Sequence, residues 1–417
     1  MTTTLFRPYD DSRDKDAVHR IWRETGWLTD EITEVMDAQI RCSRAEVAQI
    51  DGEAECLVLT IPGTIRYLDS DLPLECVTAV TTSRIARKQK LAARLTAQAI
   101  AADVADGAIV SALGMFEQGY YDRLGFGTGG YVHWYGFDPA DLRVPGATRV
   151  PRRLEPQDFQ LVHANRLSRR RGHGSCTLTP AGFTHADMLG GRTKGRFGLG
   201  FCDGPGGRLS HHLWMRVAGD VGQGPYEVAW MAFKTREQFL ELMGLIKNLS
   251  DQVRAVFVRE SHGIQLQDLV SKPFRRRRQD AALREWGDRA GVAAYWQARI
   301  CDVGRCLDKT VLRGGDEVRF NLVLSDPIDQ FLPADGPWRG VAGEYVVTLG
   351  GSSGAQPGSD DALPILTASV NAFSRMWLGV RPATALNFTD DLSGPPELLE
   401  ALDSLLRLPD PQPDWDF

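Results

Sequence analysis

Between residues 75 and 115 the chain passes from an apolar segment, ECVTAVTT, through a long helix-like segment to a second apolar segment, AIVSALGM. The two apolar segments are short and bounded by charge or glycine, which is typical of buried strands. The segment between them, roughly 84–105, carries Leu91, Leu95, Ala99 and Ala102 at helical spacing. A strand, a helix and a strand in this order predict a βαβ unit, and therefore a sheet covered by helices.

The flanking segments extend this unit into an α+β layer. Residues 14–25 place Val18, Ile21 and Trp22 on one helical face. Strand-like runs are expected at 54–63, 64–74 and 131–137, the last as the closing strand of the layer.

The remainder of the chain predicts two more units, because 417 residues exceed one ordinary core. A stretch rich in proline and charge at 138–156 resembles a linker, and strand, helix and strand patterns follow at 226–233, 236–251 and 252–261. The third segment has a short amphipathic helix at 299–309, strands at 317–326 and 343–350, a flexible loop at 350–364, and helices at 367–379 and 396–408. We therefore expect domains at 1–145, 146–298 and 299–417.

Composition and charge limit the partners and the cellular location that can be expected for the protein. A net charge of −6 argues against general nucleic-acid binding, and the basic runs RLSRRRGHG and FRRRRQD are interpreted as loop or interface charge. No window approaches 18 uncharged apolar residues, so no membrane span is expected, and the acid-rich N-terminus does not look like a secretory signal. Seven scattered cysteines indicate reduced thiols in a cytoplasmic protein. Cys301 and Cys306 lack a second pair or a His cluster, so no metal site is expected.

Two neighbouring segments carry the candidate chemistry. The run SRIARKQKLAARL after ECVTAVTT is a basic turn opening a helix, where backbone amides and the helix dipole favour a pyrophosphate; a solvated basic helix face is the alternative. After the next strand, FEQGYYDRLGFG combines glycines, which let backbone bend sharply behind a ligand, with a phenol at Tyr121. An inert hairpin turn is the alternative there.

Together, AVTTSRIARKQKLAARL and LGMFEQGYYDRLGFG resemble the acyl-CoA site of GNAT-superfamily N-acetyltransferases, and more narrowly the enhanced-intracellular-survival (Eis-type) family. The pattern E-x-G-x-Y-x-R-x-G-[YF]-G is matched by Glu117, Gly119, Tyr121, Arg123, Gly125, Phe126 and Gly127. VRFNLVLSDP, LTASVNAFSRMWLGV and a short tail ending in an aromatic residue are similar to the family's closing segment. The resemblance implies tandem GNAT-like domains, each a mixed sheet with flanking helices, followed by a sterol-carrier-like α+β domain.

The resemblance also implies roles for particular residues. Acetyl-CoA, or another acyl-CoA, would be the co-substrate, and a primary amine of a small molecule or a lysine-like group the acceptor. Tyr121 would be the general acid that protonates the departing thiolate, and the α-carboxylate of Phe417 the general base. The acyl-CoA would lie on Val80, Thr82, Arg87, Lys88, Gln89, Lys90, Leu91 and Ala92. Trimers or hexamers are the assembly that the resemblance implies.

Some features leave alternatives open. Lys90 stands where the family's pyrophosphate loop has its central glycine, and Phe116 stands where a small polar residue is usual. A catalytically silent GNAT fold that binds a ligand or a partner is therefore the alternative function, and lipid carriage by the last domain is a third. Asp30 and Glu31 are candidates for attracting a cationic substrate, with a helix cap as the alternative.

Overall fold

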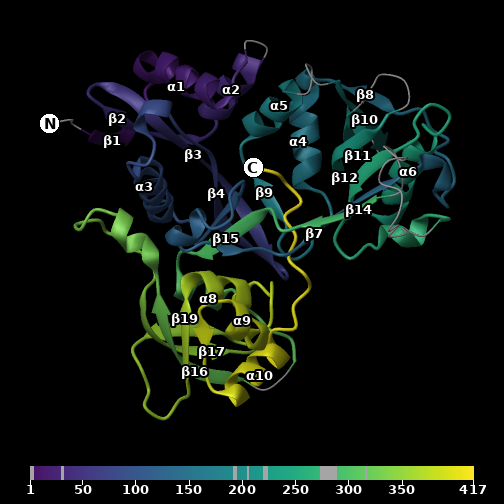
Figure 1. The fold of residues 1–417 in the computed structure, drawn as a ribbon. Helices are drawn as coiled ribbons and strands as arrows, with labels where there is room; N and C mark the ends of the chain where they lie inside the picture. Colours follow the sequence, from purple (N-terminus) through teal and green to yellow (C-terminus); the bar gives the residue numbers. More distant parts are fainter. Residues whose placement is uncertain are drawn as a thin grey trace, which may run out of the picture.

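The computed structural model describes residues 4–29, 32–190, 195–203, 206–218, 224–272, 289–314 and 317–417. Within these ranges the chain forms three sheets, one in each of three lobes (Figure 1). The first and second lobes lie side by side, and the third lies below them in the view of Figure 1. The helices are α1 (Asp11–Thr25), α2 (Thr33–Arg41), α3 (Leu91–Ala105), α4 (Phe159–Leu167), α5 (Ala181–Leu189), α6 (Arg236–Lys247), α7 (Val303–Asp308), α8 (Val370–Trp377), α9 (Ala383–Thr389) and α10 (Pro396–Leu405).

The first sheet is mixed and has the strand order β1-β2-β3-β4-β5-β15-β6, with β9 paired to β3. Its strands are β1 (Thr4–Pro8), β2 (Arg44–Ile50), β3 (Glu53–Tyr67), β4 (Ser70–Thr82), β5 (Val110–Gly114), β6 (Gly127–Thr128), β9 (Cys176–Leu178) and β15 (Trp296–Ile300). The three strand runs expected at 54–82 are in fact two long strands of one hairpin, β3 and β4, which turns at Leu68 with φ 50°. The helix expected at 14–25 is confirmed as α1, with Val18, Ile21 and Trp22 fully buried.

The predicted βαβ unit is confirmed, because β4 and β5 are parallel and α3 joins them. The helix was expected from about 84, but α3 begins at Leu91. Between them lie a 3₁₀ turn at Arg84–Ala86 and two residues with left-handed backbone, Lys88 (φ 63°) and Lys90 (φ 61°). A left-handed residue interrupts a right-handed helix, so the helix starts about two turns later than the sequence pattern indicates.

The second sheet has the order β14-β7-β13-β12-β11-β10-β8. Its strands are β7 (Val132–Phe137), β8 (Arg152–Leu154), β10 (Arg196–Asp203), β11 (Arg208–Val217), β12 (Tyr226–Ala232), β13 (Val256–Arg259) and β14 (Arg289–Ala293). The segment 131–137 was expected to close the first sheet, and this was wrong: β7 pairs with β13 and β14 in the second. Its place beside β5 is taken by β15, which begins 164 residues after the start of β7 and pairs antiparallel with β5 and β6. The first two lobes therefore exchange strands.

The third sheet has the order β18-β17-β16-β19-β20, and α8, α9 and α10 pack on it. Its strands are β16 (Val318–Ser325), β17 (Gly343–Leu349), β18 (Gly354–Pro357), β19 (Ile365–Ser369) and β20 (Leu392–Ser393). The helix expected at 299–309 is shorter, because residues up to Ile300 belong to β15, and the loop expected at 350–364 contains β18. In the part of the chain that the structure describes, no helix has the length and apolar run needed to cross a bilayer.

Candidate functional site

The two parallel strands at the centre of the first sheet separate toward their C-terminal ends. β4 and β5 pair from Leu74↔Val110 to Val77↔Leu113. β4 then bulges, with Ala79 at φ 51°, and continues along β3 alone to Thr82, while β5 ends at Gly114. Residues 78–82 consequently have no strand partner on the β5 side among the described residues. Val80 and Thr82, both predicted site residues, lie on this open strand edge and are half-buried.

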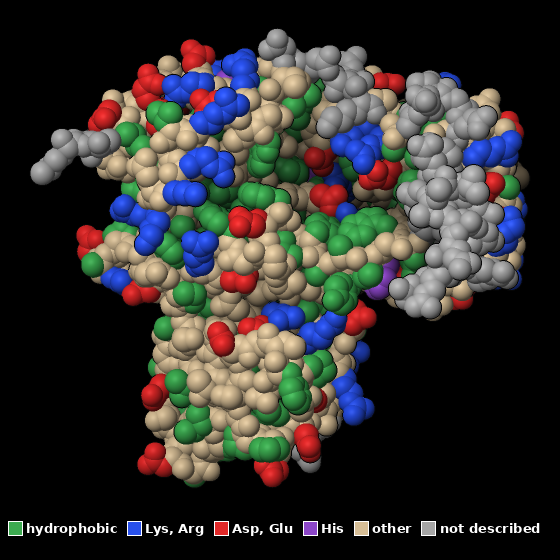
Figure 2. All heavy atoms as spheres, in the orientation of Figure 1, with side chains coloured by type: hydrophobic (Ala, Val, Ile, Leu, Met, Phe, Trp, Pro, Cys, Tyr) green, Lys and Arg blue, Asp and Glu red, His purple; other side chains and the backbone are tan. Residues whose placement is uncertain are grey.

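A basic turn connects this open edge to α3. Four of the predicted site residues lie on the turn and are exposed: Arg87, Lys88, Gln89 and Lys90. The next two begin the helix; Leu91 is buried and Ala92 is half-buried. Figure 2 shows several Lys and Arg side chains over the region where Figure 1 draws α3.

Lys90 is the N-cap of α3, and no described side chain caps the first turn. The amides of that turn are among the donors that a helix leaves unpaired at its start, so they can bind an anion. Arg84 of the same basic run is held elsewhere, because its backbone N–H donates to Glu24 Oε2 (2.7 Å) and its guanidinium donates to the Glu24 carbonyl (3.1 Å).

Lys90 adopts a backbone conformation that favours glycine. Its φ of 61° and ψ of 16° lie in the left-handed region, which glycine enters without steric cost. The lysine keeps that conformation, and its side chain is exposed.

Tyr121 opens a 3₁₀ turn, Tyr121–Leu124, that ends at Gly125 with φ 83°. Its side chain is 2% exposed and packs in the same apolar cluster as Leu113 and Leu91. The rings of Tyr120 and Phe126 meet it edge-on, with centroids 4.8 and 6.2 Å away. Burial, assisted by nearby Tyr120 and Glu117, raises the pKa of Tyr121, so the phenol stays protonated near neutral pH.

The third lobe holds the turn that carries Tyr121. Asn371 of α8 donates through Nδ2 to the carbonyls of Asp122 (2.9 Å) and Phe126 (2.7 Å). Arg299 of β15 donates to the Leu124 carbonyl and forms an ion pair at 2.5 Å with Asp326, and both charged side chains are fully buried. No role was expected for these side chains from the sequence: Asn371 and Asp326 lie in segments quoted for the family resemblance, but nothing local to them shows that they reach the turn at 121–127.

The C-terminal tail runs back from the third lobe and ends between the other two (Figure 1), where the surface in Figure 2 is recessed. Trp415 is 1% exposed, and Phe417 is half-buried. A Cβ built on Gly114 would lie 3.2 Å from the terminal Phe417 oxygen, so the chain end touches the end of β5. Phe417 packs against one apolar cluster and Tyr121 belongs to another, and each cluster includes residues of β5. Both residues therefore lie near this strand, in contact with different clusters.

Other candidates are placed differently or not at all. Asp30 and Glu31 lie outside the described residues, as does the basic run at 274–280. Cys301 and Cys306 are buried free thiols. Among the residues that the structure describes, no group of three or more His, Cys, Asp or Glu side chains is arranged to hold a metal ion.

Comparison with known proteins places the fold. No protein-family model matches the chain, and curated proteins give no match. Among solved structures, a conserved protein of unknown function from Enterococcus faecalis, described as a probable N-acyltransferase, matches with a TM-score of 0.79 at 19% identity over 100% of both chains. A GCN5-related N-acetyltransferase from Kribbella flavida matches with a TM-score of 0.76 at 17% identity, over 100% of this chain and 99% of that chain. Eis1 from Mycobacterium abscessus matches with a TM-score of 0.76 at 16% identity over 100% of both. The chain therefore has, along its whole length, the mixed α/β fold of GNAT-type proteins.

Proposed function

We propose that the protein is an acyl-CoA-dependent N-acyltransferase, with acetyl as the expected acyl group, acting on a primary amine. The observation that carries the proposal is the separation of β4 and β5. One strand runs into a basic turn and a helix N-terminus, while the other ends beside Tyr121 and the C-terminal carboxylate. Such a site can hold an anionic, strand-like co-substrate at one end and perform proton transfer at the other.

The open edge of β4 supplies the binding half of this site. Backbone groups of Val80 and Thr82 would pair with the amides of a pantetheine arm, as a neighbouring strand would. The pyrophosphate would take the free amides at the start of α3 and the surrounding charge. The residues of this half are Arg87, Lys88, Gln89, Lys90, Leu91 and Ala92.

Two groups of the chain would move protons in the proposed reaction. A bound thioester supplies the acyl group, and the amine nitrogen forms a bond to its carbonyl carbon as the carbon–sulfur bond breaks. The Phe417 carboxylate accepts the proton that the amine loses, directly or through one water, and the Tyr121 hydroxyl donates a proton to the departing sulfur. Because burial keeps Tyr121 protonated, the phenol is in the form that this role requires.

We also place the chain in the Eis-type branch, with a sterol-carrier-like third domain. The domains proposed at 1–145, 146–298 and 299–417 then exchange strands, because β7 of the first joins the second sheet and β15 near the second boundary joins the first sheet. Support comes from the full-length match to Eis1 and from the helices packed on the third sheet. A homo-oligomer, trimer or hexamer, is proposed from the resemblance, and light scattering of the purified protein tests it. Seven free cysteines support a reducing, cytoplasmic setting.

A catalytically silent GNAT fold is the second candidate, because Lys90 holds a strained position that glycine would hold without cost. Extending the C-terminus by a short Gly-Ser tag separates the two. The tag moves the carboxylate from the end of β5, and Tyr121→Phe removes the proton donor. Both variants should keep acyl-CoA binding and lose most turnover of an amine panel. A tagged enzyme that runs at the native rate would refute the carboxylate as base, and a wild-type protein without turnover would favour the silent fold.

A further inference from the structure

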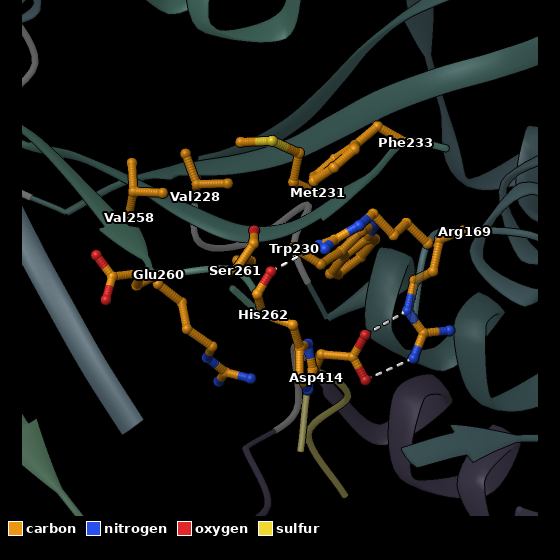
Figure 3. A pocket seen from close by; sticks show the side chains of 13 residues that line it. Arg169, Val228, Trp230, Met231, Phe233, Val258, Glu260, Ser261, His262 and Asp414 are labelled. Atoms are coloured by element: carbon orange, nitrogen blue, oxygen red, sulfur yellow. Dashed lines mark hydrogen bonds and ion pairs between the residues drawn. The ribbon is translucent and has the colours of Figure 1, made fainter. Parts of the chain in front are cut away.

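The second sheet repeats the strand separation of the first. β12 and β13 are parallel and pair only at Tyr226↔Val256 and Glu227↔Phe257, after which β12 follows β11 and β13 follows β7. A cavity of about 50 Å³ lies where they separate, lined by residues of both strands and by the loop after β13. Figure 3 shows this cavity with Asp414 of the tail at its border, paired with Arg169.

Backbone contacts fix the tail against this lobe just before its end. The Gln412 N–H donates to the His173 carbonyl (3.1 Å), and Nε2 of His262 lies 2.9 Å from the Gln412 carbonyl. A Cβ on Gly174 would lie 2.6 Å from the Gln412 nitrogen, so the tail and the loop before β9 meet backbone to backbone.

Three arginines of the second lobe then bind three consecutive tail residues. Arg169 donates to both oxygens of Asp414, at 2.7 and 2.6 Å. The Arg166 guanidinium lies 3.6 Å from the centroid of the buried Trp415 ring. The side chain of Asp416 pairs with the third, Arg259, at 2.5 Å.

These contacts account for two of the four arginines of the basic run RLSRRRGHG, Arg166 and Arg169. Burial would raise the pKa of Asp414, but the charge and hydrogen bonds of Arg169 hold it below its ordinary value, so the pair is ionised at neutral pH. Burial also lowers the pKa of Arg166 to about 10, which still leaves a cation to stack on Trp415. Arg166 and Arg169 are therefore interface charge against the chain's own end, whereas Arg171 pairs with Asp71 of β4 and Arg170 donates to the His262 carbonyl.

Tyr295 links the last of these contacts to the end of β5. Its hydroxyl donates to Asp416 Oδ1 (2.9 Å), and its backbone carbonyl accepts from the Met115 N–H (2.7 Å). Met115 follows Gly114, the residue against which the terminal oxygen lies. Asp416 is thereby held next to the strand end where the carboxylate of the following residue is proposed to act.

From these contacts we infer that the second lobe is a receptor for the C-terminal tail, and that Arg169 and Arg259 are positioning residues for the terminal carboxylate. This inference rests on the proposed function for its catalytic meaning, but the docking itself does not depend on it. Arg259 is the better residue to test, because its partner Asp416 is mostly exposed and keeps its hydration when unpaired. Removing Arg169 would leave the more buried Asp414 charge without its partner and could unfold the site.

The experiment uses the full-length protein with Arg259→Gln and, separately, Asp416→Asn. The control is Arg254→Gln. Arg254 is exposed, and among the described residues its guanidinium donates only to the Ser250 carbonyl, at 3.4 Å. Removal of C-terminal residues by a carboxypeptidase, followed by mass spectrometry, reports docking without requiring activity. Each test variant should be trimmed about three- to fivefold faster than wild type, the loss expected for one surface ion pair, and the control at the wild-type rate.

Turnover is measured on the same variants. The test variants should lose about tenfold or more in kcat with an unchanged KM for acyl-CoA, because the carboxylate is displaced and the acyl-CoA site is not touched. Trimming at the wild-type rate in both variants overturns the receptor proposal. Faster trimming with unchanged kcat overturns the positioning role. If trimming is faster and kcat is unchanged, the enzyme with the C-terminal tag tests the carboxylate itself. Lost turnover in the tagged enzyme supports the carboxylate as base, and native turnover refutes it.

Discussion

Lys90→Gly tests why the start of α3 has its shape. Lys90 has φ 61°, which costs an L-residue about 1–2 kcal/mol, whereas glycine pays nothing there but loses about 0.5–1 kcal/mol more chain entropy on folding. The difference predicts that the variant stabilises the start of α3 by about 0.5–1 kcal/mol. The matched control is Lys90→Ala, which removes the charge but keeps the Cβ and therefore the strain.

Hydrogen exchange at the amides of residues 91–95 is the suitable assay, since local opening is measured without assuming that three lobes unfold together. Exchange there should slow by about two- to fivefold in Lys90→Gly relative to Lys90→Ala. The same two variants separate the effect of the backbone from the effect of the charge on acyl-CoA binding, and a lower apparent KM is expected for Lys90→Gly. Equal exchange in the two variants would refute the strain argument.

Other predictions follow from buried groups and from the chain end. Asp326→Ala leaves the buried Arg299 without its ion pair and should destabilise the protein by about 3–5 kcal/mol, measured as a lowered urea midpoint for the third lobe; an unchanged midpoint would contradict this. Burial lowers the pKa of His173 to about 4 and that of His212 to about 3, from 6.5. The unfolded chain therefore takes up protons first, so stability that is complete above pH 6.5 should fall as the pH drops toward 4, by up to about 1.4 kcal/mol per pH unit for each histidine. Replacing either by Gln should flatten that slope in thermal melts between pH 4 and 7. Gly114→Ala puts a methyl 3.2 Å from the terminal carboxylate oxygen, and about a tenfold lower kcat with unchanged acyl-CoA affinity is expected from steady-state kinetics; native kcat would place the reacting centre elsewhere.

Local patterns in the sequence were sufficient for α1 and for the βαβ unit of β4, α3 and β5, but not for the start of α3 at Leu91 or of β4 at Ser70. The apolar residues of these elements recur at the spacing that buries one face, and this spacing can be read from the sequence. The pairing of 131–137 was not predictable in the same way. Alternation shows that a strand has a buried face, but it does not say which sheet provides that face, and β15 lies far away in sequence.

The residues of the candidate site differ in the same way: some belong to local motifs, and others meet only in the folded chain. Tyr121 and the turn at 87–92 could be proposed from the sequence because each belongs to a local motif. The tail receptor was not found, because Arg169 and Asp414 are 245 residues apart. One signal was present: the basic run RRR at 169–171 and an acidic pair around an aromatic, DWD, at 414–416. A second basic run at 275–278 offers the tail the same charge, so the sequence alone does not select the partner.

Calorimetric titration with acetyl-CoA measures whether an acyl-CoA binds along the open edge of β4, and we expect one site per chain. We also expect Arg87→Ala combined with Lys88→Ala to weaken binding much more at low salt than at high salt, because exposed charges are screened. No detectable binding of acetyl-CoA to the wild-type protein would refute the proposed site, and so would an affinity that the double variant leaves unchanged at low salt.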